Sequence, residues 1–259
     1  MIGRMSSVNA VLLFFAAALA GLMNSVAGGG SFVSFPSLIF TGVLPIPANA
    51  TSTVALWPGS VASVWAYWGK LPTNLRLLLP LTVSSLVGGL VGAHILLRTP
   101  QATFMHLVPY LFLVATLLFT FGKKLSAAFG SILKSSGPPS GLTVFGATLV
   151  QFVIAIYGGF FGGGIGILML ALLAMIQMED IHSMNAVKSL LAGAINGAAV
   201  VTFIVARAVL WPQAVLMIVG AVLGSYGGAR LAQKLDPKLV RGFVIVVGFS
   251  MTAYFLWRY

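Results

Sequence analysis

The chain has 259 residues, of which 59% are hydrophobic and 7% are charged, and its net charge is +11. Soluble domains carry roughly a quarter charged residues, so this composition excludes a water-soluble fold. Cys is absent, which excludes disulfides, thiolate catalysis and Cys-based metal sites.

Ten apolar segments follow one another along the chain. At about 1.5 Å per residue, about 20 helical residues cross a hydrocarbon core about 30 Å thick. We therefore predict an all-α integral membrane protein with about eight to ten spans. In chain order, the segments cover residues 9–27, 31–44, 49–68, 75–97, 103–122, 142–161, 164–177, 183–206, 209–231 and 239–257.

Residues 1–20 have the pattern of a secretory signal peptide, with one Arg before an apolar stretch that ends in small residues. A similar segment, residues 142–161, recurs in the middle of the chain, where a signal peptide does not occur. We therefore expect the first segment to be a structural helix.

A Gly/Pro/Ser-rich stretch, residues 133–141, predicts a linker, because Gly and Pro stop helices. Matching landmarks occur in the same order on both sides of it, which predicts two membrane repeats, residues 1–132 and 142–259. The landmarks are the triplets Gly28–Gly30 and Gly162–Gly164, the pairs Ser52/Lys70 and Ser189/Arg207, and the stretches Gly88–Ala93 and Gly224–Ala229.

The basic residues lie between the apolar segments and not along one stripe, so we expect them to contact anionic lipid headgroups and expect no nucleic-acid partner. Lys and Arg concentrate on cytoplasmic loops. Inverted repeats place ten of the 14 basic residues inside, whereas repeats of equal orientation place eight there. This favours inverted repeats with an odd number of crossings each, the pattern of secondary transporters.

Each glycine triplet precedes a short apolar segment. Residues 31–44 reach only about 21 Å as a helix, so it stays open whether residues 31–44 and 164–177 cross fully or are re-entrant. A Gly-rich break leaves backbone amides unpaired, and such a break must be buried in protein or line a wet cavity. Because helix N-termini attract anions, we predict that both breaks face a shared substrate pocket near the midplane. The alternative is close helix packing through small residues.

Polar residues near the breaks complete the predicted site. Ser31 is placed to cap the first short helix, and polar stretches open the third and eighth segments at matching positions. The alternatives are N-capping and, for Lys188, snorkelling to the interface. The predicted substrate-binding residues are Gly28, Gly29, Gly30, Ser31, Asn49, Thr51, Ser52, Gly162, Gly163, Gly164, Asn185, Lys188 and Ser189.

The residues for catalysis and for common coupling schemes are missing. Glu179, Asp180 and Asp236 are the only carboxylates and fall in or near loops, so no buried acid relay is visible. The three His residues lack metal-ligand spacing, and no phosphate-binding loop occurs. We therefore expect no enzyme activity, no cofactor and no metal. An anion that leaves a cell gains about 2.3 kcal/mol per charge per 100 mV, so export could run on the membrane potential.

The stretches Ala27–Phe32 and Pro47–Ser52 resemble the first half of the sulfite exporter (TauE/SafE) family, and Gly158–Gly166 is similar to its second half. The resemblance covers essentially the whole chain. It implies a multi-pass bacterial inner-membrane permease that exports sulfite, sulfoacetate, other organosulfonates or related anions. One departure is Val187-Lys188-Ser189, where a small residue followed by Thr-Ser is expected. A fixed cation at this position would tighten binding or favour a more highly charged anion.

Two other functions fit the same sequence. An anion channel would use the same scaffold, but would carry large single-channel currents instead of saturable flux. A membrane assembly protein without transport would tolerate enlargement of the first glycine triplet. The coupling ion and the oligomeric state cannot be read from the sequence.

Overall fold

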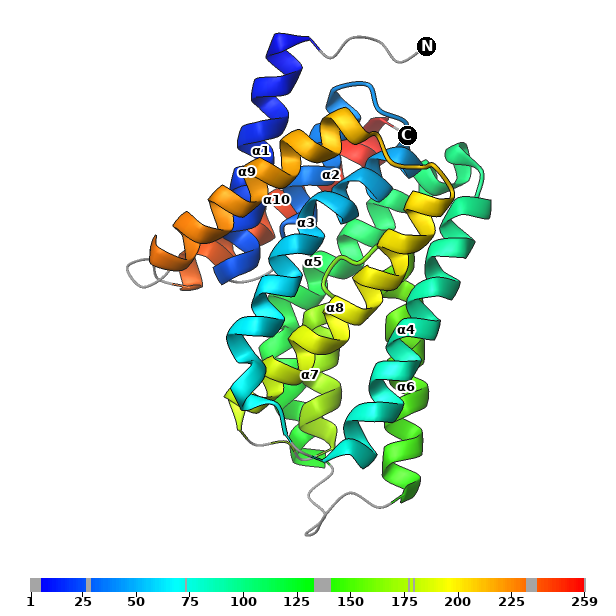
Figure 1. Cartoon of the computed structure of the whole chain (residues 1–259), viewed down its shortest axis with the longest axis vertical. Coiled ribbons are helices and arrows are strands. Elements are labelled where there is room, and N and C mark those ends of the chain that lie inside the picture. The colour runs from blue at the N-terminus through cyan, green and yellow to red at the C-terminus, as the bar shows by residue number, and fades with distance from the viewer. Residues whose placement is uncertain are drawn as a thin grey trace. The chain divides into compact units, whose positions relative to one another are not determined.

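The computed structural model describes residues 6–26, 29–72, 74–132, 141–176, 178, 180–231 and 237–258. Over these residues the chain is helical and contains no strand, so all ten apolar segments are confirmed as helices (Figure 1). The helices are α1 (Ser7–Val26), α2 (Ser31–Phe40), α3 (Pro45–Tyr67), the 3-10 helix η1 (Trp68–Lys70), α4 (Leu75–Arg98), α5 (Gln101–Ile132), α6 (Gly141–Phe160), α7 (Ile165–Met175), α8 (Ile181–Val205), α9 (Trp211–Leu231) and α10 (Pro237–Arg258).

The chain is an integral membrane protein. Within the described ranges, five helices are both long and apolar enough to cross a bilayer, namely α1, α4, α5, α6 and α8. The helices α3, α9 and α10 have 23, 21 and 22 residues, which is also enough in length. By contrast, α2 and α7 have 10 and 11 residues and reach only about 15–17 Å, too little for a full crossing. Their lengths do not fit the upper end of the predicted eight to ten spans, and a total of eight stays a prediction.

The chain divides into two compact units. Unit 1 contains residues 1–59, 99–113 and 203–259, and unit 2 contains residues 60–98 and 114–202. Each unit therefore combines segments from both sides of the predicted linker, of which residues 133–140 lie outside the described part. The helix α3 leaves unit 1 after Gly59, one residue beyond Pro58, which lacks the N–H of a regular helix hydrogen bond. The division into two sequence repeats stays a prediction.

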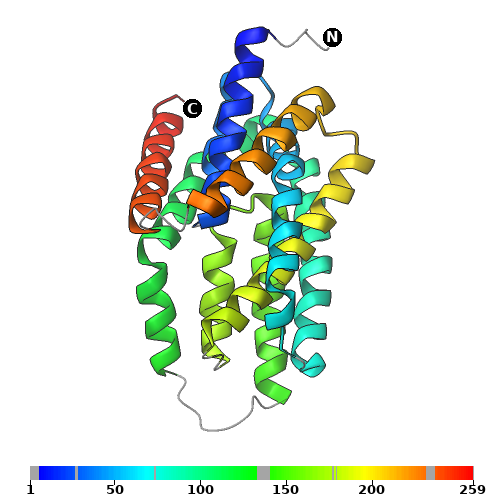
Figure 2. The ribbon, with the colours of Figure 1, turned by 60° about the vertical axis from the view of Figure 1, so that its left-hand side comes forward.

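In unit 1, α1 packs along α9 (Figure 2), and α2 packs against α1 and α10. Glycines allow the first of these contacts, because a Cβ on Gly224 would overlap the carbonyl oxygen of Ala18. Beside α2 lies a buried aromatic cluster in which ring centroids are 5.3 to 6.4 Å apart. Its members are Phe32, Phe35, Phe104, Phe112 and Phe255.

In unit 2, α4 lies alongside α6, and α6 packs against α7 (Figure 1). Small residues again bring the backbones together, as they do in many membrane proteins. A Cβ on Gly92 would overlap the Ile156 carbonyl oxygen, and one on Gly88 would lie 2.6 Å from the Ala155 Cβ. The apolar core around this contact includes Leu81, Met169, Leu191 and Ile195, each with 0% of its surface exposed.

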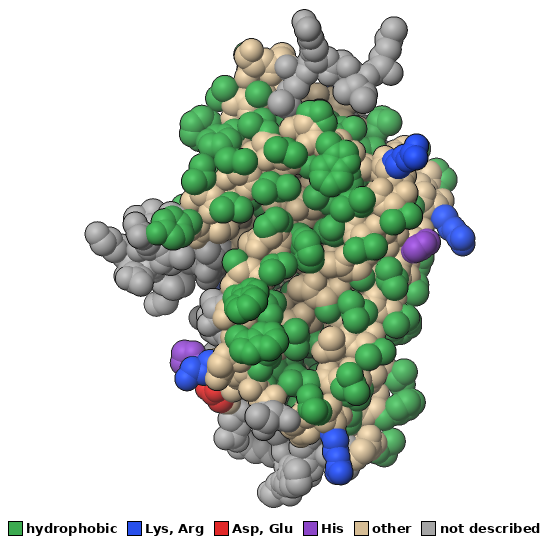
Figure 3. Space-filling model, in the orientation of Figure 1, with side chains coloured by type: hydrophobic (Ala, Val, Ile, Leu, Met, Phe, Trp, Pro, Cys, Tyr) green, Lys and Arg blue, Asp and Glu red, His purple; other side chains and the backbone are tan. Residues whose placement is uncertain are grey.

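Large apolar side chains also cover the outer surface, where lipid replaces water as the solvent (Figure 3). Examples are Leu79 at 63% exposure and Phe145 at 61%. At the end of α3, Trp65 and Trp68 are exposed and stack with their ring centroids 6.3 Å apart. Stacked exposed indoles beside Lys70 are typical of the aromatic belt at a membrane boundary.

Candidate functional site

The first glycine break lies before α2 in unit 1. Gly29 has φ +88°, a backbone conformation that L side chains rarely adopt, and Gly28 lies outside the described residues. Gly30 caps α2 and Ser31 is its first helical residue, so the prediction that Ser31 caps this helix was wrong. The Gly30 N–H donates a hydrogen bond to the Asn24 side-chain oxygen at 2.7 Å. A polar residue of α1 therefore satisfies this amide.

The polar residues of α3 do not form the start of their helix, contrary to the sequence prediction. The helix begins at Pro45, because Pro fits the first helical position, where no N–H partner is needed. Asn49, Thr51 and Ser52 consequently lie in the second turn, and their exposed fractions are 4%, 0% and 2%. Their burial places hydroxyl and amide groups inside unit 1 and not at a wet helix end.

These buried hydroxyls are paired within unit 1. The Ser34 and Ser52 hydroxyl oxygens lie 2.7 Å apart, and the Ser34 hydroxyl also lies 3.2 Å from the Gly30 carbonyl oxygen. The Thr51 hydroxyl oxygen accepts a hydrogen bond from the Leu210 N–H at 3.1 Å. The first break is thus tied to α3 by a chain of hydrogen bonds that runs from Gly30 through Ser34 to Ser52.

The second glycine break joins α6 to α7 in unit 2. Gly162 and Gly164 have φ values of +82° and +76°, so both occupy the left-handed region that favours glycine. The Tyr157 hydroxyl donates a hydrogen bond to the Gly163 carbonyl oxygen at 2.8 Å and holds the loop against α6. Gly164 caps α7 without a side-chain hydrogen bond.

Backbone donors that lack an acceptor in the described part of the chain lie at this second break. Among the described residues, the N–H groups of Gly163, Gly164, Ile165 and Gly166 have no hydrogen-bond acceptor, and the first paired amide is that of Ile167, which donates to the Gly164 carbonyl at 3.1 Å. The helix that follows has 11 residues, so its dipole adds positive potential at the same end. Such a terminus attracts a negatively charged group.

The polar stretch of α8 also lies inside its helix and not at the start, again contrary to the prediction. Asp180 caps α8, because its carboxylate accepts hydrogen bonds from the Ser183 hydroxyl at 2.7 Å and from the N–H groups of Ser183 and His182 at 3.0 and 3.2 Å. These bonds, the one from the Ser183 hydroxyl first, hold the pKa of the exposed Asp180 carboxyl below its usual value of 3.8. Asn185, Lys188 and Ser189 therefore lie further along α8.

Lys188 lies against the first turn of α7. A Cβ built on Gly166 would be 3.5 Å from the Lys188 Cδ, an ordinary van der Waals contact. The Lys188 ammonium donates one hydrogen bond, at 2.9 Å, to the Asn185 side-chain oxygen. Because the Lys188 ammonium has three protons, two of them remain for another acceptor. The neighbouring Ser189 is 8% exposed, and its hydroxyl has no hydrogen-bond partner in the described part of the chain.

The structure thus brings the predicted residues together within each unit. In unit 1 it links Gly30 to Ser52, and in unit 2 it places Lys188 and Asn185 beside the residues that follow Gly164. Whether the two breaks share one pocket stays a prediction. Sequence reasoning missed three partners, each a lone polar residue within one or two turns of a glycine triplet. They are Asn24, Ser34 and Tyr157.

Comparison with known proteins gives one family and several relatives. The family described as sulfite exporter TauE/SafE matches residues 13–255. A probable membrane transporter protein of Haemophilus influenzae is 25% identical over 242 residues, covering 93% of this chain and 92% of the relative. One from Sinorhizobium is 29% identical over 240 residues, covering 92% and 89%. One from Escherichia coli K12 is 26% identical over 246 residues, covering 95% and 89%. No solved structure matches the chain significantly.

Proposed function

The chain belongs to the sulfite exporter TauE/SafE family and is a membrane transporter, and we propose that its substrates are small anions such as sulfite, sulfoacetate or other organosulfonates. In this proposal it is a secondary transporter of the bacterial inner membrane. It exports the anion down the membrane potential or an ion gradient.

One arrangement carries the proposal, namely the start of α7 with Lys188 beside it. Four backbone N–H groups without acceptors among the described residues, together with an ammonium that has one neutral partner, form a set of donors with net positive charge. Sulfite and sulfonates offer three oxygens around one sulfur, which can accept hydrogen bonds from several directions. An oxyanion at this position would replace the water lost by the amides and by the ammonium.

The first break contributes less charge in this proposal. Its Gly30 N–H is already paired with Asn24, and the hydroxyls of Ser34 and Ser52 pair with each other. No basic side chain appears among its described hydrogen-bond partners. We therefore propose that the negative end of the substrate binds at α7, and that the first break contributes neutral hydrogen-bond donors when its hydroxyl pair opens.

Helix pairing supports two structural repeats, which we propose to be inverted. In unit 1 the first helix after the amino terminus, α1, packs along α9, and in unit 2 the first helix after the linker, α6, packs along α4. Since α4 and α9 are the fourth helices of their sequence halves, both units use the same first-to-fourth pairing with the halves exchanged. Such an exchange is expected of two repeats related by a pseudo-twofold axis.

The proposal is tested by flux measurements on purified protein in liposomes. Labelled sulfite or sulfoacetate should leave the vesicles at a rate set by an imposed potassium diffusion potential, faster when the side losing the anion is negative. Inorganic phosphate and chloride serve as comparison anions. Absence of flux of both sulfur oxyanions at every voltage would refute the proposed substrate class.

The same liposomes distinguish a carrier from a channel. A carrier shows saturation and counterflow, in which unlabelled anion on one side draws labelled anion from the other at zero voltage. A channel shows neither and instead carries single-channel currents in planar bilayers. We expect counterflow, because the donors at α7 are arranged to bind the anion and not only to attract it.

A further inference from the structure

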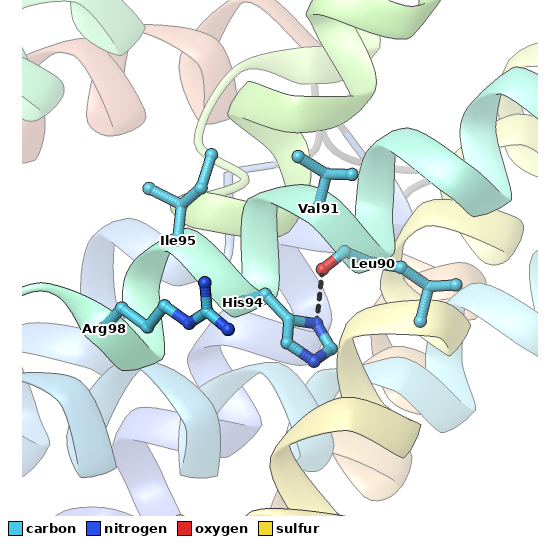
Figure 4. Close-up of a pocket in the computed structure, with 5 residues that line it drawn as sticks. All are labelled: Leu90, Val91, His94, Ile95 and Arg98. Atoms are coloured by element: carbon cyan, nitrogen blue, oxygen red, sulfur yellow. Dashed lines mark hydrogen bonds between the residues drawn. The ribbon is translucent and has the colours of Figure 1, made fainter.

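A hollow of about 360 Å³ lies on α4, and none of its lining residues belongs to either glycine break (Figure 4). Its lining residues are separated in turn by one and three positions, so they form one stripe that extends about 12 Å along the helix. The stripe is apolar toward the middle of α4 and polar toward its end. The lining residues are Leu90, Val91, His94, Ile95 and Arg98.

The apolar part of the hollow faces the surroundings of a membrane-spanning helix. Leu90, Val91 and Ile95 are 40%, 36% and 46% exposed, and α4 is one of the candidate spans. Exposed aliphatic side chains on a spanning helix contact lipid acyl chains. A hollow between them accommodates a chain better than a flat helix surface does, because more van der Waals contacts form.

Arg98 supplies a positive charge at the polar end. It is the last residue of α4, it is exposed, and it forms no ion pair in the described ranges of the chain. The guanidinium group matches the geometry of a phosphate and binds it with two parallel hydrogen bonds. A lipid phosphate at this depth would therefore be held where the helix meets the headgroup region.

His94 restricts the kind of headgroup. Its Nδ1 lies 3.0 Å from the Leu90 carbonyl oxygen, and since a carbonyl only accepts, Nδ1 carries the hydrogen (Figure 4). In the neutral ring, Nε2 is then an acceptor. A headgroup hydroxyl can donate to it. An ammonium can also donate, but the nearby guanidinium repels its charge, so the pair of side chains favours an anionic lipid with a hydroxylated headgroup.

We propose that this hollow, lined by α4, binds a phosphatidylglycerol-type lipid. The phosphate accepts hydrogen bonds from Arg98, a glycerol hydroxyl of the headgroup donates to His94 Nε2, and one acyl chain lies along Leu90, Val91 and Ile95. This inference is independent of the anion transported, because the hollow contains none of the residues proposed for the substrate.

The test measures lipid binding to the purified protein in neutral detergent by native mass spectrometry. Phosphatidylglycerol is compared with phosphatidic acid, which lacks the headgroup hydroxyl, and with phosphatidylethanolamine, which carries an ammonium. Free glycerol phosphate tests the headgroup without chains. We expect phosphatidylglycerol to bind best and glycerol phosphate to bind at least about tenfold more weakly, because it lacks the chain contacts.

Two variants and a matched control make the assignment specific. Arg98→Gln should weaken phosphatidylglycerol binding about tenfold, and His94→Phe should reduce it to the level of phosphatidic acid. Arg76→Gln changes another exposed arginine, in the first turn of α4, and should leave binding unchanged. Equal binding by wild type and Arg98→Gln, or an equal loss in Arg76→Gln, would overturn the site. Phosphatidic acid binding as tightly as phosphatidylglycerol would overturn the role of His94.

Discussion

Replacing Lys188 with Gln should weaken substrate binding strongly while leaving the fold intact. The ammonium has one neutral partner, Asn185 at 2.9 Å, and its aliphatic chain lies against Gly166 at the start of α7. Gln keeps a polar group at this position but removes the positive charge. Because the side chain contacts the helix end that we propose as the anion site, the substrate should lose a charge-assisted hydrogen bond.

The size of the loss follows from the interaction removed. Two unit charges about 4 Å apart attract by about 4 kcal/mol at an effective dielectric constant of about 20, before desolvation is counted. Hydrogen bonds to charged groups contribute about 1.5–3 kcal/mol net. A loss of about 2 kcal/mol raises the half-saturation concentration about 30-fold. A divalent anion should lose more than a monovalent one, because the Coulomb term scales with charge.

The assay is counterflow of labelled sulfite or sulfoacetate at zero voltage, with the half-saturation concentration and the maximal rate fitted separately. Lys188→Arg keeps the charge and should retain most of the affinity. Lys70→Gln, at an exposed lysine of η1, is the matched control and should behave as wild type. Unchanged half-saturation in Lys188→Gln would refute the role of this charge, and an equal change in Lys70→Gln would reduce it to a general surface effect.

Three further outcomes are expected. Gly92→Ala should lower the melting temperature and the folded yield, because the added Cβ would overlap the Ile156 carbonyl oxygen. A Cβ on Gly146 would meet no atom within 4 Å, so Gly146→Ala should leave both quantities unchanged or raise them through its higher helix propensity. Equal effects of the two substitutions would contradict the close α4–α6 packing. Ser52→Leu, which removes the partner of Ser34, should cut flux without preventing membrane insertion, and normal flux would remove the first break from the site. Folding lowers the pKa of the Asp180 carboxyl, so its stabilising contribution is present above the unfolded pKa and is lost as the pH falls through the folded pKa. Asp180→Asn should therefore lower the melting temperature at pH 7 but not at a pH below the folded pKa. A difference in melting temperature that persists in acid would contradict the role of the ionised carboxylate.

Local sequence features were sufficient to place the helices. The apolar segments became helices because a backbone in lipid must pair its own hydrogen bonds, and no partner other than the segment itself is guaranteed. The positions of the glycine breaks could also be predicted from the sequence, because Gly29, Gly162 and Gly164 adopt positive φ values that other residues avoid. The boundaries were less certain. Proline before Asn49 and aspartate before Asn185 moved two helix starts toward the amino terminus, because both residue types favour the first position or the cap.

The hydrogen-bond and packing partners of the site residues could not be predicted from the sequence in the same way. Lys188 and Gly166 are 22 positions apart, and Ser34 and Ser52 are 18 apart, so no helical period predicts these contacts. They depend on how α7 packs on α8 and how α2 packs on α3. The pairing of α1 with α9 is set in the same way, by glycines whose close approach has no counterpart within one helix.

By itself, the sequence determined the membrane environment, the helical content, the two glycine breaks and the family that the chain resembles, because these depend on composition and on short-range backbone chemistry. Only the tertiary structure decided which amides are already paired and which have no acceptor among the described residues. Asn24 takes the Gly30 N–H, whereas the amides at the start of α7 have Lys188 beside them and no described acceptor. The first pairing joins residues only six positions apart across the break, whereas Lys188 reaches the start of α7 through the packing of α8, 22 positions further along the chain.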